Sequence, residues 1–221
     1  MIREVFFDVN ETLTDFSELF VVAKQIELSD EEVRTWFSSL LRDGFALAIN
    51  QHPANFRELG KQLFTSMIME KGVKVDDETI GHFLNAFASL PAHPDLAPTV
   101  RDLVASGFSV NTLSNGSAEI ARRLMKSEGI DDLVSRYLSV SEIVWKPHPL
   151  AYKFALDSVE VEASACVLVA VHPWDIHGAI EAGMRAVWIN RGRSHYPSYF
   201  HQPTKTVDTL QKLPSALVTI S

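Results

Sequence analysis

The sequence predicts an α/β protein built on a parallel, doubly wound sheet, with an all-helical segment inserted after the first strand. Apolar runs typical of buried strands lie at residues 4–7, 108–113, 166–171 and 186–189. Each of the later three runs follows a segment with helical periodicity, and strands that alternate with helices form parallel sheets. Residues 16–90 break this alternation, because their periodicity is helical throughout.

The elements follow in order from local signals. The first strand, EVFF, ends at Asp8, and helical patterns at 96–105, 149–159 and 174–182 precede the three later strands. Gly107 and Gly183 separate two of these helices from the strands that follow. The carboxyl ends of parallel strands bind ligands in such folds, so the functional residues are expected there.

The inserted segment carries clear helix boundaries. Ser29-Asp30-Glu31-Glu32 forms a capping box, a second helix spans residues 55–71 and ends at Gly72, and a third spans about 76–90. We expect residues 16–90 to form a cap domain on a core domain of residues 1–15 and 91–221. The periodicity also allows the alternative that this segment belongs to the core.

Composition excludes several classes of function. The 221 residues are 46% hydrophobic and 22% charged, with 20 Lys and Arg against 28 Asp and Glu, a net charge of −8. This is globular composition, and the acidic balance argues against a nucleic-acid or anionic-membrane partner. A single cysteine, Cys166, cannot form an intramolecular disulfide, and no run approaches the ~18 apolar residues of a spanning helix. We expect a cytoplasmic protein acting on a small molecule, and a homodimer is left open.

Polar residues end three of the expected strands or begin the helices after them. Asp8 ends the first strand, Ser114-Asn115 ends the second, Lys146 precedes a helix, and Asp175 begins the helix after the third strand. An aspartate at a strand end can act as a nucleophile, and the Ser-Asn turn can bind an anion. Taken singly, each also has a structural explanation, such as an N-cap, a first-turn acid or a solvated lysine.

A metal site is not expected. His172 and His177 lie five residues apart, which does not match the i, i+4 spacing of a helical metal pair, and the sequence shows no third ligand.

The order of these residues resembles the haloacid dehalogenase (HAD) superfamily, and within it the type II L-2-haloacid dehalogenases. Four motifs carry the resemblance along the chain: FFDVNETLTD, TLSNGS, WKPHPLAY, and VHPWDIHGA followed by AVWINR. It implies a Rossmann-like core with an inserted helical cap. It also implies Asp8 as nucleophile, with Thr12, Lys146 and Asp175 as its catalytic partners.

Departures from the phosphatases of the superfamily favour dehalogenation. Phosphatases carry a second aspartate as general acid and base where this chain has Asn10, which cannot exchange a proton with a leaving alkoxide. A Mg²⁺-binding aspartate of their fourth motif is replaced by Val171. A departing halide requires neither group.

Other departures concern the substrate. Dehalogenases carry an arginine after a cap tryptophan, and the position after Trp36 is Phe37, so we expect a halide to face this ring and turnover to be slow. Arg42 lies on a different helical face, so we do not expect it to replace this arginine. His172 replaces an asparagine of the fourth motif.

The sequence therefore predicts a cofactor-free hydrolase that cleaves the carbon–halogen bond of a small 2-haloalkanoic acid through an ester on Asp8. Lys146 and Asp175 are expected to orient the nucleophile and the water. Expected substrate-binding residues are Asn10, Phe37, Ser114, Asn115, Tyr152, His172 and Trp174. Two alternatives remain: a Mg²⁺-dependent phosphatase with the same fold, and a catalytically degenerate binding module.

Overall fold

The computed structural model describes residues 1–73 and 76–220. The strands are β1 (Glu4–Phe7), β2 (Ser109–Ser114), β3 (Val134–Ser139), β4 (Cys166–Ala170), β5 (Arg185–Ile189) and β6 (Lys205–Val207). The α-helices are α1 (Ser17–Lys24), α2 (Asp30–Ile49), α3 (Phe56–Lys71), α4 (Asp77–Phe87), α5 (Leu96–Ala105), α6 (Ala118–Ser127), α7 (Pro149–Asp157), α8 (Pro173–Glu181) and α9 (Leu213–Thr219). Short 3₁₀ helices are η1 (Asp131–Leu133), η2 (Ala163–Ala165) and η3 (Leu210–Lys212).

The strands form one parallel sheet in the order β3-β2-β1-β4-β5-β6, which confirms the predicted fold class. β1 lies between β2 and β4, with Phe7 opposite both Thr112 and Val169. From β1 the chain builds the sheet first to one side, through β2 and β3, and then to the other side, through β4, β5 and β6. The loops after β1, β2 and β4 therefore lead away from one another at this point, which is where such folds bind ligands. All three loops begin at one edge of the sheet.

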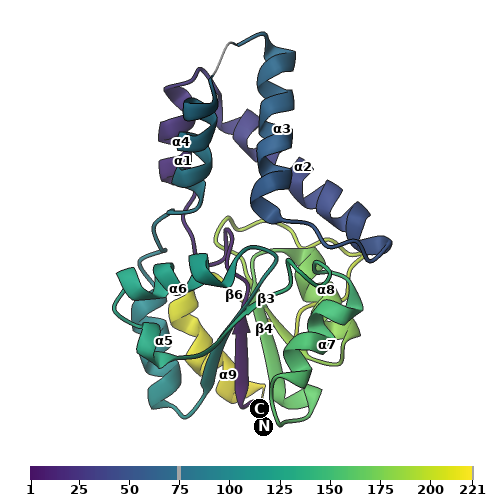
Figure 1. Cartoon of the computed structure of the whole chain (residues 1–221). Coiled ribbons are helices and arrows are strands. Elements are labelled where there is room, and N and C mark those ends of the chain that lie inside the picture. The colour runs from purple at the N-terminus through teal and green to yellow at the C-terminus, as the bar shows by residue number, and fades with distance from the viewer. Residues whose placement is uncertain (74–75, 221) are drawn as a thin grey trace.

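Helices cover both faces of the sheet (Figure 1), with α5, α6 and α9 on one face and α7 and α8 on the other. Side chains along β1 point alternately to the two faces of the sheet. Val5 and Phe7 pack with the first set of helices, and Phe6 packs with the second. A strand buried on both faces explains why EVFF is almost wholly apolar.

Helices α1 to α4 form a separate helical lobe at the top of Figure 1, with a hydrophobic cluster of its own. Trp36 of α2 lies at its centre, with its ring edge-on to Phe64, Phe83 and Phe87. Its indole N–H donates to the Gly60 carbonyl at 2.9 Å. This cluster is separate from the two that pack on the faces of the sheet, and it also includes Val144 and Trp145 from the core segment.

The expected helix boundaries in this lobe are largely confirmed. The Ser29–Glu32 capping box is formed, and Gly72 adopts the left-handed conformation (φ 73°) that ends α3. The third helix is shorter than expected, since α4 ends at Phe87 and not near Leu90.

Two links join the lobe to the sheet. The outgoing and returning chain segments pair where Thr14 bridges Ala92. Trp145 extends from the core into the lobe, where it stacks on Phe56 with ring centroids 5.0 Å apart and donates to the Ala54 carbonyl at 2.8 Å. The residue next to it is Lys146, so packing against the lobe constrains the loop that carries this lysine.

Strands β3 and β6 were not expected from the sequence. β3 lies at one edge of the sheet and its residues are mostly half-buried, so it lacks the apolar run that identifies a central strand. β6, at the other edge, has only three residues.

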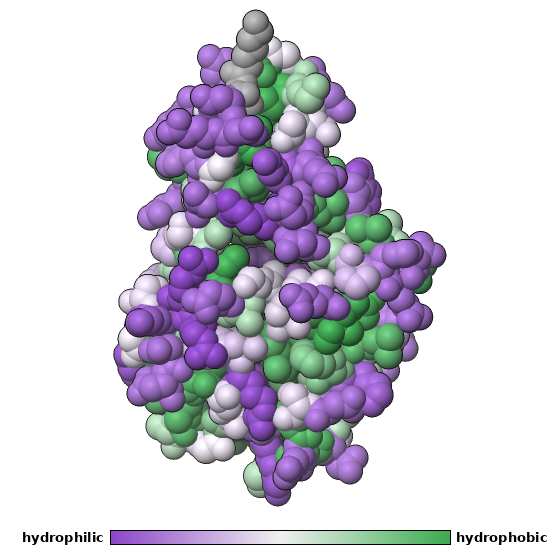
Figure 2. Space-filling view, viewed as in Figure 1, coloured by the Kyte–Doolittle hydropathy of each residue, from purple (hydrophilic) through white to green (hydrophobic). Residues whose placement is uncertain are grey.

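Over the described residues, every helix is too short or too polar to cross a lipid bilayer. In the view of Figure 2, hydrophilic side chains cover most of the helical lobe. Large exposed apolar residues such as Val21, Met69 and Val218 belong to different helices.

Candidate active site

The Asp8 carboxylate lies directly after β1 and is 4% exposed. A tight turn follows, in which the Leu13 N–H donates to the Val9 carbonyl at 2.9 Å. This turn brings Thr12 back over Asp8, and the Thr12 hydroxyl donates to Asp8 Oδ2 at 2.7 Å. Thr12, which was expected as a catalytic partner of the nucleophile, is thus in contact with it.

Lys146 links Asp8 to Asp175 from a fully buried position. Its ammonium donates to Asp8 Oδ1 at 3.0 Å and to Asp175 Oδ2 at 2.6 Å. The other oxygen of Asp175 accepts a hydrogen bond of 2.7 Å from the Tyr152 hydroxyl. Asp8, Thr12, Lys146, Tyr152 and Asp175, hereafter the Asp8 cluster, are held in one hydrogen-bonded chain.

Charge in the Asp8 cluster favours an ionised nucleophile. Burial alone would raise the pKa of Asp8, but Lys146 and His172 outweigh burial and hold that pKa well below its ordinary value. Burial lowers the pKa of Lys146, yet Asp175 and Asp8 raise it further, so the ammonium stays charged. Burial and the neighbouring charge of Asp8 raise the pKa of Asp175, while Lys146 opposes them.

The side chain of Asn115 binds the backbone of Lys146. Its amide oxygen accepts from the Lys146 N–H at 2.8 Å, and its amide nitrogen donates to the Lys146 carbonyl at 3.1 Å. Both polar ends of the Asn115 side chain are thus paired within the protein, and its binding of substrate stays a prediction. Ser114 Oγ accepts from the Gly116 N–H at 2.9 Å, which shapes the turn before α6.

His172 lies between two carboxylates. Its Nδ1 is 3.1 Å from Asp8 Oδ2, and its Nε2 is 2.9 Å from Glu11 Oε2. Burial would lower the pKa of His172, but these two carboxylates raise it to about 10, so the ring is an imidazolium at neutral pH. Trp174 stacks on the ring with centroids 5.0 Å apart.

Glu11 was not recognised from the sequence. It adopts a left-handed backbone conformation (φ 60°), and its N–H donates to Thr14 Oγ1 at 3.1 Å. Such a conformation is uncommon for a residue other than glycine and costs of order 1 kcal/mol. The motif alone gives no sign that the Glu11 carboxylate turns back toward the fourth motif.

A pocket of about 670 Å³, hereafter the entrance pocket, opens between α2 and this imidazolium. Glu11 and His172 line one side, and Arg34, Phe37 and Arg42 of α2 line the other. A second pocket of about 560 Å³ shares Glu11, Arg34 and His172 with it. Both pockets are therefore lined by Arg34 and by His172, which contacts Asp8.

The expected role of Phe37 in substrate binding stays a prediction, because the ring both lines the entrance pocket and packs in the helical lobe. The ring is 4% exposed and packs edge-on to Phe16, with centroids 5.1 Å apart, and against Phe87 at 5.9 Å. It contributes to the pocket wall but is chiefly a core residue of the helical lobe. Arg34, one helical turn earlier, was missed; its guanidinium lies 4.7 Å from the centre of the Phe20 ring and remains exposed.

The residues around Asp8 do not fit a Mg²⁺ ion, which prefers oxygen ligands in octahedral geometry. Val171 stands where a carboxylate would be needed, and its N–H donates to Thr12 Oγ1 at 3.1 Å. The Lys146 ammonium already lies between the carboxylates of Asp8 and Asp175. Asn10 lies near the Gly116 turn and is half-buried.

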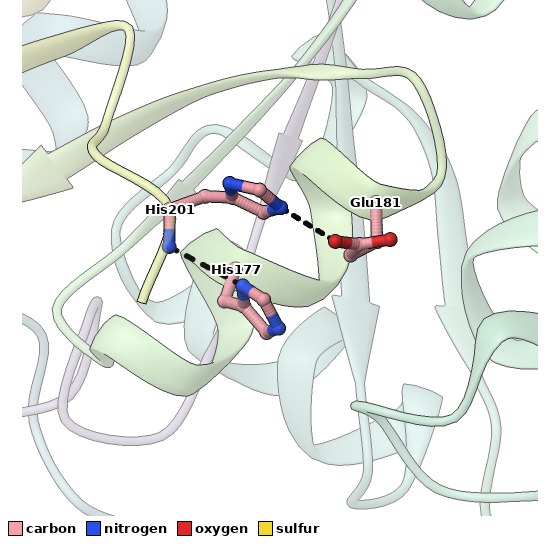
Figure 3. Close-up of side chains that lie close together, drawn as sticks. All are labelled: His177, Glu181 and His201. Carbon is pink, nitrogen blue, oxygen red and sulfur yellow. Dashed lines mark hydrogen bonds and ion pairs between the residues drawn. The ribbon is translucent and has the colours of Figure 1, made fainter. Parts of the chain in front are cut away.

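The sequence analysis found no third ligand near His177, and the structure supplies two candidates, Glu181 and His201 (Figure 3). Hydrogen bonds among His177, Glu181 and His201 account for the short distances between these side chains. His201 Nε2 lies 2.5 Å from Glu181 Oε1, and the His201 N–H donates to His177 Nδ1 at 3.3 Å. These contacts fasten the loop after β5 to α8, at a place separate from the Asp8 cluster.

The fold and the Asp8 cluster place the chain among α/β enzymes that work at the carboxyl edge of a parallel sheet. Comparison with known proteins makes the class specific. The chain belongs to the haloacid dehalogenase-like hydrolases, whose family model matches residues 2–183.

Individual relatives are more distant. The chain is 28% identical to (S)-2-haloacid dehalogenase 1 of Pseudomonas sp. strain CBS-3, over 100% of this chain and 98% of that protein. It is 26% identical to glyceraldehyde 3-phosphate phosphatase of Pyrococcus abyssi, over 87% and 83% of the two chains. The L-2-haloacid dehalogenase of Xanthobacter autotrophicus, solved with chloropropionic acid covalently bound, superposes with a TM-score of 0.90 at 19% identity over 100% of both chains. This last likeness shows a shared fold.

Proposed function

We propose that this hydrolase removes halide from small 2-haloalkanoic acids, with Asp8 as the nucleophile. The observation that carries the proposal is the setting of Asp8: a buried, ionised carboxylate whose countercharge is the Lys146 ammonium. Such a carboxylate is competent to displace a leaving group from carbon. A phosphoryl group would lack the metal ion that normally neutralises its charge.

The reaction proceeds in two steps. A carboxylate oxygen of Asp8 attacks C2, and the carbon–halogen bond breaks with its electron pair leaving on the halide. Water then attacks the carboxyl carbon of Asp8, the ester bond breaks, and a 2-hydroxy acid and one proton are released. C2 is inverted once, and no cofactor takes part.

Arg34 supplies a binding charge for the substrate carboxylate. It lines both pockets that border His172, and a buried carboxylate without a partner costs several kcal/mol. The backbone N–H groups at Ser114 and Asn115 offer a second anchor. In this proposal residues 16–90 act as a cap that closes the site and excludes water during displacement.

The proposal is tested by single turnover of 2-chloropropionate in ¹⁸O-labelled water, followed by mass analysis of the peptide that contains Asp8. We expect label in the Asp8 carboxyl group, because water attacks that carbon. Asp8→Asn should fold and lose at least about 10³-fold in turnover, whereas Asp208→Asn, at a surface ion pair, should match the parent protein.

Other outcomes separate the alternatives. Turnover should survive exhaustive chelation. Activity on small phosphate esters that vanishes with chelator and returns with Mg²⁺ would establish the phosphatase instead. Absence of both activities, with no adduct on Asp8, would support a binding module.

A further inference from the structure

His172 differs from the other side chains that hold Asp8. Thr12 and Lys146 are fully buried and line neither pocket, whereas His172 both contacts Asp8 Oδ2 and lines the two pockets that open toward solvent. Among these three contacts of Asp8, His172 is the one a water molecule from either pocket can reach. Water that approaches Asp8 from the pockets therefore meets the imidazole.

The ring is held for this contact from both sides. Glu11 binds Nε2 at 2.9 Å, and Trp174 stacks against the ring face. A carboxylate that accepts from one ring nitrogen fixes the tautomer and orientation of the other, as in nucleophile–histidine–acid arrangements. Nδ1 therefore stays aimed at the Asp8 carboxyl group.

The charge of Asp8 changes during the proposed reaction. Before the first step, Asp8 and Glu11 both stabilise the imidazolium. The ester has no charge, so it removes one of these two carboxylates, while burial continues to disfavour the charged ring. The pKa of His172 must then fall, and Nδ1 can release its proton to water in the pockets that His172 lines, while the N–H at Nε2 stays paired with Glu11.

We propose that His172, oriented by Glu11, is the general base that activates water for hydrolysis of the Asp8 ester. This assignment rests on the proposed function. Nδ1 takes one proton from water as the water oxygen bonds to the Asp8 carboxyl carbon. The ester C–O bond then breaks, the departing alkoxide oxygen takes the second proton of that water, and the 2-hydroxy acid departs. Asp8 regains its negative charge beside the newly formed imidazolium, which restores the starting state.

Other charged groups near the ring oppose or support this cycle from outside. Arg34 and Arg42 of α2 line the entrance pocket, and His93 and Arg191 line the second pocket. Lys146 reaches the opposite oxygen of Asp8. The three arginines and Lys146 favour loss of the imidazole proton once Asp8 is esterified. Burial and Arg191 lower the pKa of His93, so its ring adds no charge at neutral pH.

The experiment follows ester formation and ester hydrolysis separately, by quenching 2-chloropropionate reactions over time and recording intact protein mass. His172→Gln keeps a side-chain amide able to donate to Asp8 but cannot accept the proton. We expect its ester to form within about tenfold of the parent rate and to be hydrolysed about 10²- to 10⁴-fold more slowly, so the adduct accumulates. His177→Gln, in the helix α8 that begins directly after His172 but outside the site, should accumulate none.

Glu11→Gln gives an independent measurement, which stands even if His172→Gln does not fold. Loss of the Glu11 charge lowers the pKa of the imidazole, so the acidic limb of the hydrolysis rate should move to lower pH, and the plateau should fall as the base weakens. A purely structural role for Glu11 would reduce the rate without moving that limb.

The outcomes are distinct. Normal ester hydrolysis in His172→Gln overturns the general-base role. A variant that fails to form the ester also overturns it, because His172 would then act in the displacement of halide and not in the hydrolysis of the ester. If the parent protein forms no adduct with any haloacid, the proposed dehalogenase function itself fails.

Discussion

Asn115 holds Lys146 by both ends of its side-chain amide, across 31 residues of sequence. The lysine backbone is thus fixed by one residue after β2, while its ammonium is fixed by Asp8 and Asp175. The position of the lysine backbone therefore depends on Asn115, and the charge of its ammonium depends on Asp8 and Asp175. Separate substitutions can test these two effects.

Asn115→Ala should lower stability by about 1–3 kcal/mol, because it leaves the buried N–H and carbonyl of Lys146 without partners. Turnover should fall as well, since the ammonium is no longer centred between the carboxylates. Chemical denaturation and halide release measure the two effects. Asn85→Ala removes an exposed amide that binds Arg57 and should change neither by much. Unchanged turnover in Asn115→Ala would show that the carboxylates alone place the lysine.

Arg34 and Arg42 form a matched pair on α2. Both line the entrance pocket, but the Arg42 side chain is 68% exposed and pairs with Asp43 at 2.7 Å. We expect Arg34→Gln to reduce kcat/KM for 2-chloropropionate by roughly 10- to 100-fold, the range for a charge-assisted contact with a carboxylate. Arg42→Gln should change it less than about threefold. The opposite ranking would place the substrate carboxylate nearer Arg42.

Phe37→Arg is expected to destabilise the helical lobe. The sequence alone suggests that an arginine here would speed turnover, but the ring packs against Phe16 and Phe87, so a guanidinium in its place would be buried among aromatic rings. Loss of about 2–5 kcal/mol should appear in thermal unfolding. Phe45→Arg, at a half-buried position of the same pocket, should cost less. A stable and faster Phe37→Arg protein would mean that the lobe can rearrange.

Gly178→Ala should displace Tyr152 from Asp175. A Cβ at this position would lie 2.4 Å from the Tyr152 hydroxyl oxygen, too close for any real contact, so the ring must move and its hydrogen bond to Asp175 must lengthen. We expect lower stability and lower turnover together. Gly81→Ala meets nothing within 4 Å inside α4 and should stabilise the protein by up to about 1 kcal/mol. Normal activity in Gly178→Ala would show that the tyrosine contact is dispensable.

His172 also predicts how stability depends on pH. Its pKa in the folded protein, about 10, lies above the ordinary value of 6.5, so the folded state binds the proton more tightly. The stabilisation is complete below about pH 6.5 and is lost as pH rises toward 10, with a slope of up to about 1.4 kcal/mol per pH unit. Urea unfolding across this range should show the decline. His172→Gln should flatten it, and His52→Gln, at an exposed residue, should not.

Local sequence signals determined much of the architecture. Strand–helix alternation gave the parallel sheet, because burial on both faces demands apolar strands. Capping residues located α2 and α3, since their hydrogen bonds are made within three residues. Strand ends gave Asp8 and Ser114, because parallel strands finish at one edge.

Tertiary structure decided what these residues touch. Glu11 binds His172 across 161 residues, and Asn115 binds the backbone of Lys146, contacts that no local pattern specifies. Helix phase places Arg34 and Phe37 on neighbouring positions of one helical face, and both line the entrance pocket, but it could not tell that Phe37 is also buried against Phe16 and Phe87. Burial then set the charges: only the packed site places His172 between two carboxylates and so makes it an imidazolium.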